Sequence, residues 1–260
     1  MKEFIFDEKK YAEDMIFDHK VDRNNINAYI FQLAKYNYFV ENMDDDSNYH
    51  NIVDYLRKYC SMFAESDYCI KIEKIIKQVK KREYIKVDSI KIRQSELDFI
   101  KSLDNIRQEK LAFVLLCISK FNHEAYHTND YWVNNYSIGT VGTLARVHVT
   151  KQEKLELYRE LYLKHAFELS NKIGTFNQRI LFVSEDENDP VVLELNEIDY
   201  KELAYTYLYY KNGFSGYARC EKCGRLIRKK ANNQKYCKEC SQIVEKEKCR
   251  QRVQKHREKM

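Results

Sequence analysis

Apolar residues recur at helical spacing through the first half of the chain. Ile72, Ile75, Ile76 and Val79, for example, fall on one face of a helix. All six glycines and the single proline come after residue 138, so the strongest helix breakers are missing from the first half. The pattern predicts helices over residues 9–18, 26–42, 52–65 and 70–81, with turns at 24–25 and 44–48.

A second helical group begins in the middle of the chain. The apolar pattern predicts helices over residues 109–121 and 137–147. Thr150 and Glu153 have the spacing of a capping box, in which a hydroxyl caps the helix and a carboxylate three residues later caps in return. They predict a third helix that starts after Thr150 and runs to about residue 167. Leu155, Tyr158, Leu161 and Tyr162 are expected on its buried side.

Two predicted strands follow this third helix. Residues 179–184 and 191–195 have strand-like patterns, and the acidic segment 185–190 between them ends in Pro190 and has the composition of a turn. Three helices followed by a hairpin is the element order of a winged helix, whose third helix enters the major groove of DNA. The sequence therefore predicts a winged helix, although mixed charge on the third helix and an acidic hairpin turn disfavour DNA reading by that helix.

Four cysteines near the end of the chain form two C-x-x-C pairs. Cys220 and Cys223 make the first pair, Cys237 and Cys240 the second, and thirteen residues separate them. Gly224 follows the first pair, where a tight turn favours a residue that tolerates positive φ. Four thiolates at this spacing can hold one tetrahedral Zn²⁺ in a closed structural site, with no position left for a catalytic water. We expect one structural zinc ion, whose binding supplies folding free energy to a small polar segment.

Positive charge is concentrated at the same end of the chain. Residues 211–260 contain 16 Lys and Arg against 5 Glu, which leaves a net charge of −6 on the rest of a chain whose total is +5. A basic segment beside a metal module favours contact with phosphate backbones, and residues 241–260 are expected to form an exposed basic helix. The predicted phosphate-contacting residues are Arg225, Arg228, Lys229, Lys230, Lys235, Arg250 and Arg252.

The cysteine segment resembles the four-cysteine zinc fingers that close many bacterial and phage proteins. It is loosely similar to the class named for its Cys-Gly-Asn-Arg (CGNR) motif, although that tetrapeptide is absent here. The preceding stretches K-L-A-F-V-L-L-C from Lys110, Y-W-V-N from Tyr131 and A-R-V from Ala145 resemble uncharacterised proteins of phages and mobile elements. Over residues 90–260, this resemblance implies a winged helix before the zinc finger and nucleic-acid work for a mobile element.

A second metal motif must be weighed against the first. His123, Glu124 and His127 match H-E-x-x-H, the zinc-binding pattern of metalloproteases. No companion motif supplies a third ligand, and the surrounding asparagines and aspartate indicate the end of a helix, so a solvated histidine pair is favoured. The candidates for a third ligand are Glu153, Glu156, Glu160 and His165.

Other catalytic classes lack their required residues. A His-Asn-His nuclease needs histidine between its cysteine pairs, but residues 224–236 contain none. No Walker A loop or G-x-G-x-x-G occurs either. We therefore expect a protein that is not an enzyme.

The location and thiol state are also indicated by the sequence. Acidic residues interrupt the first fourteen positions, unlike a signal peptide, and the longest apolar run, 111–118, is too short to span a bilayer. We expect a cytoplasmic protein without membrane contact. The remaining cysteines, expected as free thiols, are Cys60, Cys69, Cys117 and Cys249.

These patterns predict a mainly α protein with a small β-hairpin and three parts. They are a helical domain (1–105), a winged-helix domain (106–210) and a four-cysteine zinc finger with a basic helical tail (211–260). The favoured function is non-catalytic binding of nucleic acid, as a DNA-binding regulator or replication accessory of a phage or mobile element. Tyr217 and Tyr236 could stack on unpaired bases, which leaves single strands and RNA open. The alternative is an anti-CRISPR-like inhibitor whose acidic helical body binds a host nucleic-acid or defence enzyme.

Overall fold

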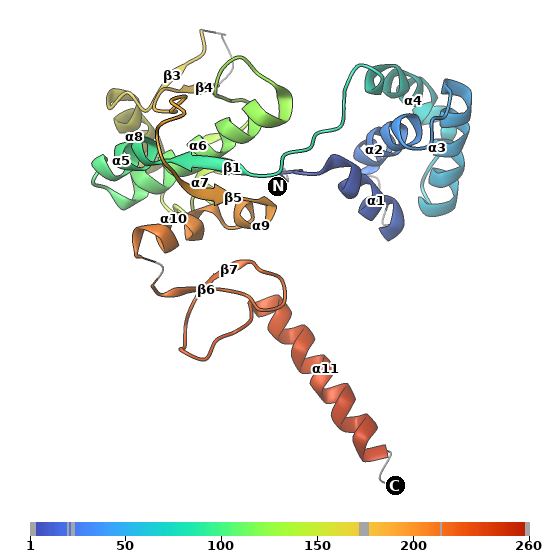
Figure 1. Ribbon diagram of the computed structural model, residues 1–260. Helices are drawn as coiled ribbons and strands as arrows, with labels where there is room; N and C mark the ends of the chain where they lie inside the picture. Colours follow the sequence, from blue (N-terminus) through green and yellow to red (C-terminus); the bar gives the residue numbers. More distant parts are fainter. Residues whose placement is uncertain (1–3, 20, 22–23, 172–176, 214, 258–260) are drawn as a thin grey trace. The chain divides into compact units, whose positions relative to one another are not determined.

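The computed structural model describes residues 4–19, 21, 24–171, 177–213 and 215–257 (Figure 1). The chain divides into two compact units: Ile5–Asp88 form the smaller, and Ser89–Met260 with the residues before Ile5 form the larger. In chain order, the elements are α1 (Glu8–Asp18), α2 (Ile26–Phe39), α3 (Asp45–Tyr59), α4 (Glu65–Val79), β1 (Ile90–Arg93), α5 (Gln94–Ser102), α6 (Ile106–Tyr126), β2 (Trp132–Val133), α7 (Ile138–Leu144), α8 (Lys151–Leu163), β3 (Phe167–Leu169), β4 (Gln178–Ile180), β5 (Val191–Leu195), α9 (Glu197–Tyr200), α10 (Leu203–Lys211), β6 (Tyr217–Arg219), β7 (Leu226–Arg228) and α11 (Lys238–Arg257).

The smaller unit is built from the helices α1 to α4 around one apolar core. The predicted stripe on α4 is buried there, together with side chains of α2 and α3 such as Ile30 and Leu56. The core also encloses one ion pair: Lys35 Nζ lies 2.5 Å from Glu8 Oε2, and both side chains are almost fully buried. Lys35 also donates to the carbonyl oxygen of Glu83, so its charge is well compensated.

Helix α3 begins seven residues before its predicted start. The predicted turn at 44–48 is instead the cap and first turn of this helix: Asp44 Oδ1 accepts a hydrogen bond from the Ser47 N–H at 2.7 Å. This hydrogen bond also lowers the pKa of the Asp44 carboxyl. Acidic residues stabilise helix N-termini, so the run of aspartates starts a helix and does not interrupt one.

Helix α6 is the centre of the larger unit. Phe113, Leu116 and Ile118 are fully buried, and the helix contacts α5, α7, α8 and α10 as well as strands β1, β2 and β4. Asn105 caps its first turn by accepting the Arg107 N–H at 3.0 Å. A helix that is apolar on nearly all sides requires such complete cover, so the predicted apolar helix over 109–121 became the core of the unit.

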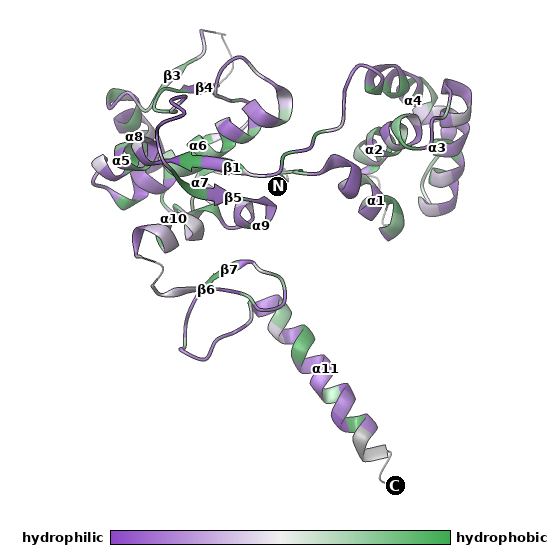
Figure 2. Ribbon diagram, in the orientation of Figure 1, coloured by the Kyte–Doolittle hydropathy of each residue, from purple (hydrophilic) through white to green (hydrophobic). Residues whose placement is uncertain are grey.

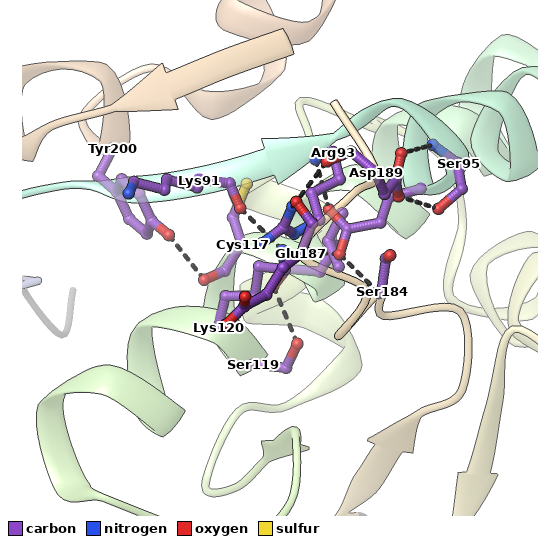
Figure 3. Close-up of polar contacts among 12 residues, drawn as sticks. Lys91, Arg93, Ser95, Cys117, Ser119, Lys120, Ser184, Glu187, Asp189 and Tyr200 are labelled. Atoms are coloured by element: carbon purple, nitrogen blue, oxygen red, sulfur yellow. Dashed lines mark hydrogen bonds and ion pairs between the residues drawn. The ribbon is translucent and has the colours of Figure 1, made fainter. Parts of the chain in front are cut away.

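The ion pair Lys120–Glu96 ties α6 to the start of α5. Lys120 Nζ lies 2.6 Å from Glu96 Oε1 and donates to the carbonyl oxygen of Lys91 at 2.7 Å (Figure 3). Glu96 is fully buried and also accepts the backbone N–H groups of Arg93 and Ser184. The Glu96 carboxylate therefore connects the start of α5 with α6, with the end of β1 and with the segment between β4 and β5.

The predicted hairpin of residues 179–184 with 191–195 is wrong. β4 lies between β2 and β3 in a three-stranded antiparallel sheet, whereas β5 pairs with β1 in a separate two-stranded sheet. The acidic segment between β4 and β5 binds the start of α5: Asp189 accepts hydrogen bonds from the backbone N–H and hydroxyl of Ser95, and Arg93 donates to the Asp189 carbonyl (Figure 3). These contacts hold the segment that connects β4 in the three-stranded sheet to β5 in the two-stranded sheet.

The capping box of α8 is confirmed. The Thr150 hydroxyl accepts the Glu153 N–H, and the Thr150 N–H donates to Glu153 Oε2 at 2.9 Å. The helix ends at Leu163, before the predicted end, because Phe167 already belongs to β3. Tyr158 and Leu161 are buried as predicted, but Leu155 (42%) and Tyr162 (49%) are exposed.

Two further expectations concern membranes and cysteines. Within the described part of the chain, no helix has the length and apolar character needed to cross a bilayer. None of the eight cysteines forms a disulfide; Cys60 and Cys117 are buried, and Cys249 is exposed.

Candidate functional site

The first cysteine pair lies in the turn of the β6–β7 hairpin. The Cys220 N–H donates to the carbonyl oxygen of Arg225, and the Gly224 N–H donates to the carbonyl oxygen of Cys220 at 2.8 Å. Gly224 has φ +71, the left-handed backbone predicted for this turn. An added Cβ at Gly224 would also lie 3.3 Å from Ile198 Cδ1. We name residues 217–240 the four-cysteine module.

The second pair comes from the start of α11 and completes a compact group of sulfurs. The four Sγ atoms all lie within 4.8 Å of one another, and Cys223 Sγ is 3.9 Å from Cys237 Sγ. A tetrahedron with Zn–S bonds of about 2.3 Å has S···S edges of about 3.8 Å. The four cysteines could therefore hold one metal ion, and the sulfur spacing fits Zn²⁺.

Backbone N–H groups point at the cysteine sulfurs. The Cys237 N–H donates to Cys220 Sγ at 3.3 Å, and the Cys240 N–H donates to Cys237 Sγ at 3.4 Å. Burial opposes ionisation of Cys220, but the hydrogen bonds from the backbone of Cys237, Cys223 and Lys222 outweigh it and lower the pKa of Cys220 to about 6. Burial and the neighbouring sulfurs raise the pKa of Cys240. Ionisation of the Cys220 thiol is thus favoured, whereas ionisation of Cys240 is disfavoured until a bound cation compensates the negative charge.

The module has very little apolar core of its own. Besides the buried cysteines, the core cluster contains Ile227 with Tyr236 packed against it. So few apolar side chains cannot offset the conformational entropy of ordering the module. We therefore expect the fold of the module to depend on a metal held by the sulfur group.

The module is attached to α9 and α10 by specific contacts. Arg219 Nη2 lies 2.7 Å from Asp199 Oδ1, and Asp199 is 2% exposed. Tyr217 is also buried, and its ring packs against Tyr205 of α10 at 5.6 Å between centroids. Tyr217 is therefore used for attachment, and its ring is not open to an unpaired base.

Replacing Asp199 by asparagine removes the ionic part of this attachment. We expect the free energy of unfolding to fall by about 1–2 kcal/mol, a modest loss because Arg219 is half exposed. Denaturant unfolding of the zinc-loaded protein measures the change. Glu221→Gln is the control, since its pair with Lys235 is exposed on both sides. Equal stability of the Asp199 variant and the unsubstituted protein would contradict the attachment.

The predicted phosphate-contacting residues divide into two groups. Arg225 is paired with Glu239 at 3.3 Å and Lys235 with Glu221 at 3.2 Å. The others are exposed, and no ion pair within 4.0 Å is found for them among the described residues; they are Arg228, Lys229, Lys230, Arg250 and Arg252. Three of these five are consecutive at the end of β7.

The predicted basic tail is helical as far as it is described. Helix α11 starts just after Cys237, and nearly all of its described side chains are exposed. Figure 2 shows a mostly hydrophilic helix with scattered apolar positions. Arg250 and Arg252 are among the exposed side chains and are therefore accessible.

The H-E-x-x-H motif does not assemble a metal site in the described residues. Helix α6 ends at Tyr126, and His127 has the left-handed φ of 49, so the two histidines do not share a helical face. The His123 ring lies 4.4 Å from the ring of Tyr131. Among the described residues of the whole chain, the cysteine group is the only cluster of three or more His, Cys, Asp or Glu with metal-binding geometry. None of the candidate third ligands therefore joins the two histidines.

Sequence reasoning missed the residues that attach and surround the module. Asp199, Tyr205 and Arg219 have no distinctive spacing, and only the fold brings them together. No protein-family model, curated protein or solved structure matches the chain. The class defined by fold and site is thus a mainly helical protein with a C-terminal four-cysteine group that could hold one metal ion.

Proposed function

We propose that this protein is a non-catalytic nucleic-acid-binding protein whose phosphate contacts come from a zinc-stabilised four-cysteine module. One observation carries the proposal: Arg228, Lys229 and Lys230 form an exposed cationic run on the module, and none of them has an ion-pair partner among the described residues. Exposed cations that bind a phosphate backbone displace the counterions condensed on the nucleic acid, and the entropy of their release favours association. Arg250 and Arg252 extend this charge along α11.

Zinc is the metal that the donor set favours. Four thiolates in a tetrahedron select Zn²⁺ or iron–sulfur chemistry, whereas Mg²⁺ and Ca²⁺ require oxygen ligands. The 3.9 Å contact between Cys223 and Cys237 suits a single ion. When bound, the ion would supply the cross-link that the small core of the module lacks.

A winged helix in the larger unit is part of the proposal. Its support is the order α6, β2, α7, α8, β3, β4 and the strand order β2-β4-β3, which places the last strand in the middle of the sheet. The hairpin of such a domain would be β3–β4, joined by residues 170–177, of which 172–176 lie outside the described residues. The winged helix therefore rests on different strands from those that the sequence predicted.

Helix α8 is not assigned the reading of bases. Its exposed face carries Leu155, Tyr162 and Leu163, together with the ion pair Arg159–Glu156. Apolar side chains and a neutralised arginine do not match the acceptors and donors of base edges. We assign affinity to the four-cysteine module and α11 and leave specificity to contacts not yet located.

The biological setting follows from the resemblance alone. We propose a cytoplasmic regulator or replication accessory of a phage or mobile element, with DNA preferred to RNA. A basic module with little shape selectivity also binds single strands, so the preference among nucleic acids needs direct measurement.

Fluorescence-anisotropy titration of the zinc-loaded chain tests the function. Duplex DNA, single-stranded DNA and RNA are titrated at about 50 and 200 mM salt, and we expect affinity to fall by roughly 10²–10³-fold between the two for about five phosphate contacts. The ranking of the three ligands then identifies the nucleic acid. A folded, zinc-loaded chain that binds none of them would refute the proposal.

The exposed apolar face of α8 favours a second candidate, an inhibitor that binds a host nucleic-acid or defence enzyme. Leu163 is 63% exposed, and contiguous exposed apolar residues mark protein interfaces more often than nucleic-acid ones. Such a complex would resist nuclease treatment and moderate salt and would be lost in Leu163→Glu. The nucleic-acid hypothesis predicts instead that the complex is lost on nuclease treatment and at moderate salt, and that Leu163→Glu leaves it intact.

A further inference from the structure

A recess of about 650 Å³ lies at the start of α8, away from the four cysteines. The beginning of α6, the segment between α7 and α8, and the first turn of α8 form its wall. The residues that line it are Arg107, His148, Val149, Thr150, Glu153 and Lys154. Neither the cysteine spacing nor the basic C-terminal segment indicates a site here.

Cationic side chains gather around this recess. Arg107 and Lys154 line it, and Lys110 lies one helical turn after Arg107 on α6. Lys110 Nζ donates to the carbonyl oxygen of Arg146 at 3.0 Å. Burial first, and then the charges of Arg107 and Arg146, lower the pKa of Lys110, which is the response of a lysine in a positive environment.

Lys154 is held in place by a glycine of the neighbouring helix. A Cβ added at Gly142 would lie 3.2 Å from Lys154 Cε and 3.4 Å from Lys154 Cδ. The aliphatic stem of Lys154 therefore lies against the backbone of α7, in space that any larger residue would take. Packing of the stem restricts the rotamers of Lys154 and reduces the entropy that its ammonium loses on binding a ligand.

The one carboxylate of the recess is already used. Glu153 Oε2 accepts hydrogen bonds from the Thr150 N–H at 2.9 Å and the Thr150 hydroxyl at 2.8 Å. These bonds, followed by the charge of Arg107, lower the pKa of Glu153. Arg107 and Lys154 have no ion-pair partner within 4.0 Å in the described part of the chain. They are available to an anion from outside.

We propose that this recess binds a backbone phosphate of the nucleic acid, as a second contact separate from the four-cysteine module. A guanidinium and an ammonium that line one open recess suit the two non-bridging oxygens of a backbone phosphate, to which they can donate charge-assisted hydrogen bonds. The proposal rests on the proposed function and deepens it, since it gives the body of the larger unit a direct share in binding.

Contacts connect the recess to the module through the fold. Arg146, whose carbonyl oxygen holds Lys110, lies over the ring of Tyr205 at 4.2 Å and pairs with Glu202 at 2.5 Å. Tyr205 in turn packs against Tyr217 of β6. One set of packed side chains therefore connects both sites within the larger unit, which lowers the ordering cost for a nucleic acid that contacts both.

The test compares two charge-matched double variants of the zinc-loaded chain. R107Q/K154Q removes the two cations that line the recess, and K151Q/R159Q removes two cations of α8 that do not line it. Duplex DNA is titrated at several salt concentrations, with zinc content and melting temperature measured for each protein. We expect R107Q/K154Q to bind about 3–10-fold more weakly, with a salt slope less negative by about 1, and K151Q/R159Q to bind nearly as the unsubstituted chain does.

Each other outcome overturns the proposal in a recognisable way. Equal weakening by both variants would show a general effect of net charge, and no weakening by either would leave the recess without a role. If R228Q/K229Q/K230Q then still weakens binding, the proposed function stands and only the recess fails. No binding by the unsubstituted chain refutes the function itself. The recess could instead bind free phosphate, so inorganic phosphate is titrated at constant ionic strength. If R107Q/K154Q loses millimolar binding of phosphate but keeps its affinity for DNA, the recess binds a free anion and the proposal is wrong.

Discussion

Replacing Cys237 by serine is expected to abolish metal binding and to weaken nucleic-acid binding strongly. Cys237 is buried, its sulfur lies 3.9 Å from that of Cys223, and it accepts the N–H of Cys240. Three thiolates hold zinc far less tightly than four, and structural zinc contributes about 10–16 kcal/mol to the folding of small modules. Zinc per chain should fall from one to near zero, and affinity for DNA should fall by at least about 100-fold.

The control for this loss is Cys249→Ser. Cys249 is exposed on α11 and does not belong to the sulfur group, so its replacement should leave zinc content and affinity unchanged. Zinc is measured by atomic emission after gel filtration, and affinity by anisotropy at fixed salt. A Cys237 variant that loses its zinc but keeps full affinity would remove the metal from the proposed mechanism. A variant that keeps one zinc per chain would show that Cys237 is not a required ligand. Chelation of the unsubstituted chain should reproduce the variant and be reversed by added zinc.

The triple variant R228Q/K229Q/K230Q is expected to lose most of the affinity while keeping the metal. These side chains are exposed and free of internal ion pairs in the described residues, so they can neutralise phosphates and release the counterions condensed on the nucleic acid. Each lost phosphate contact makes the salt slope less negative by about 0.9. We expect a change of about 2–3 in the slope and a loss of roughly 10²-fold in affinity at 0.1 M salt.

A second triple variant separates these positions from net charge. K222Q/R225Q/K235Q also removes three cations from the module, but each of them is paired, with Glu247, Glu239 and Glu221 respectively. Its effect on the slope should be clearly smaller. If the two triple variants bind DNA equally weakly, the run at the end of β7 has no special role and the charge of the module acts as a whole.

Local chemistry made much of the fold predictable from the sequence. The capping box at Thr150 and the apolar stripe of α4 depend on residues three or four positions apart, and both are confirmed. The cysteine group was found for the same reason, since its spacing reflects the geometry of one ion. Helix α3 shows the limit of this reasoning: aspartates favour turns and helix starts alike, and only packing decides between them.

Strand pairing was the main failure, because it depends on residues far apart in the chain. Residues 191–195 were correctly predicted as a strand, but their partner is β1, far earlier in the chain, and not the strand just before them. The decisive contacts are those of Asp189 with Ser95 and Arg93, which no local pattern reveals. Similarly, the sequence could name Arg225 and Lys235 as basic but could not show that each faces a carboxylate.

The attachment of the four-cysteine module limits how the chain can be cut and recombined. Metal modules of this size are often treated as cassettes to be moved between proteins, but this one shares a buried carboxylate, Asp199, with the helix that precedes it. A recipient chain would lack that carboxylate, and the donor, once trimmed, would retain a buried charge without its guanidinium. Gly224 would likewise lose its neighbour, the side chain of Ile198 in α9. A fusion that preserves the architecture should therefore take α9 and α10 along with the cysteines.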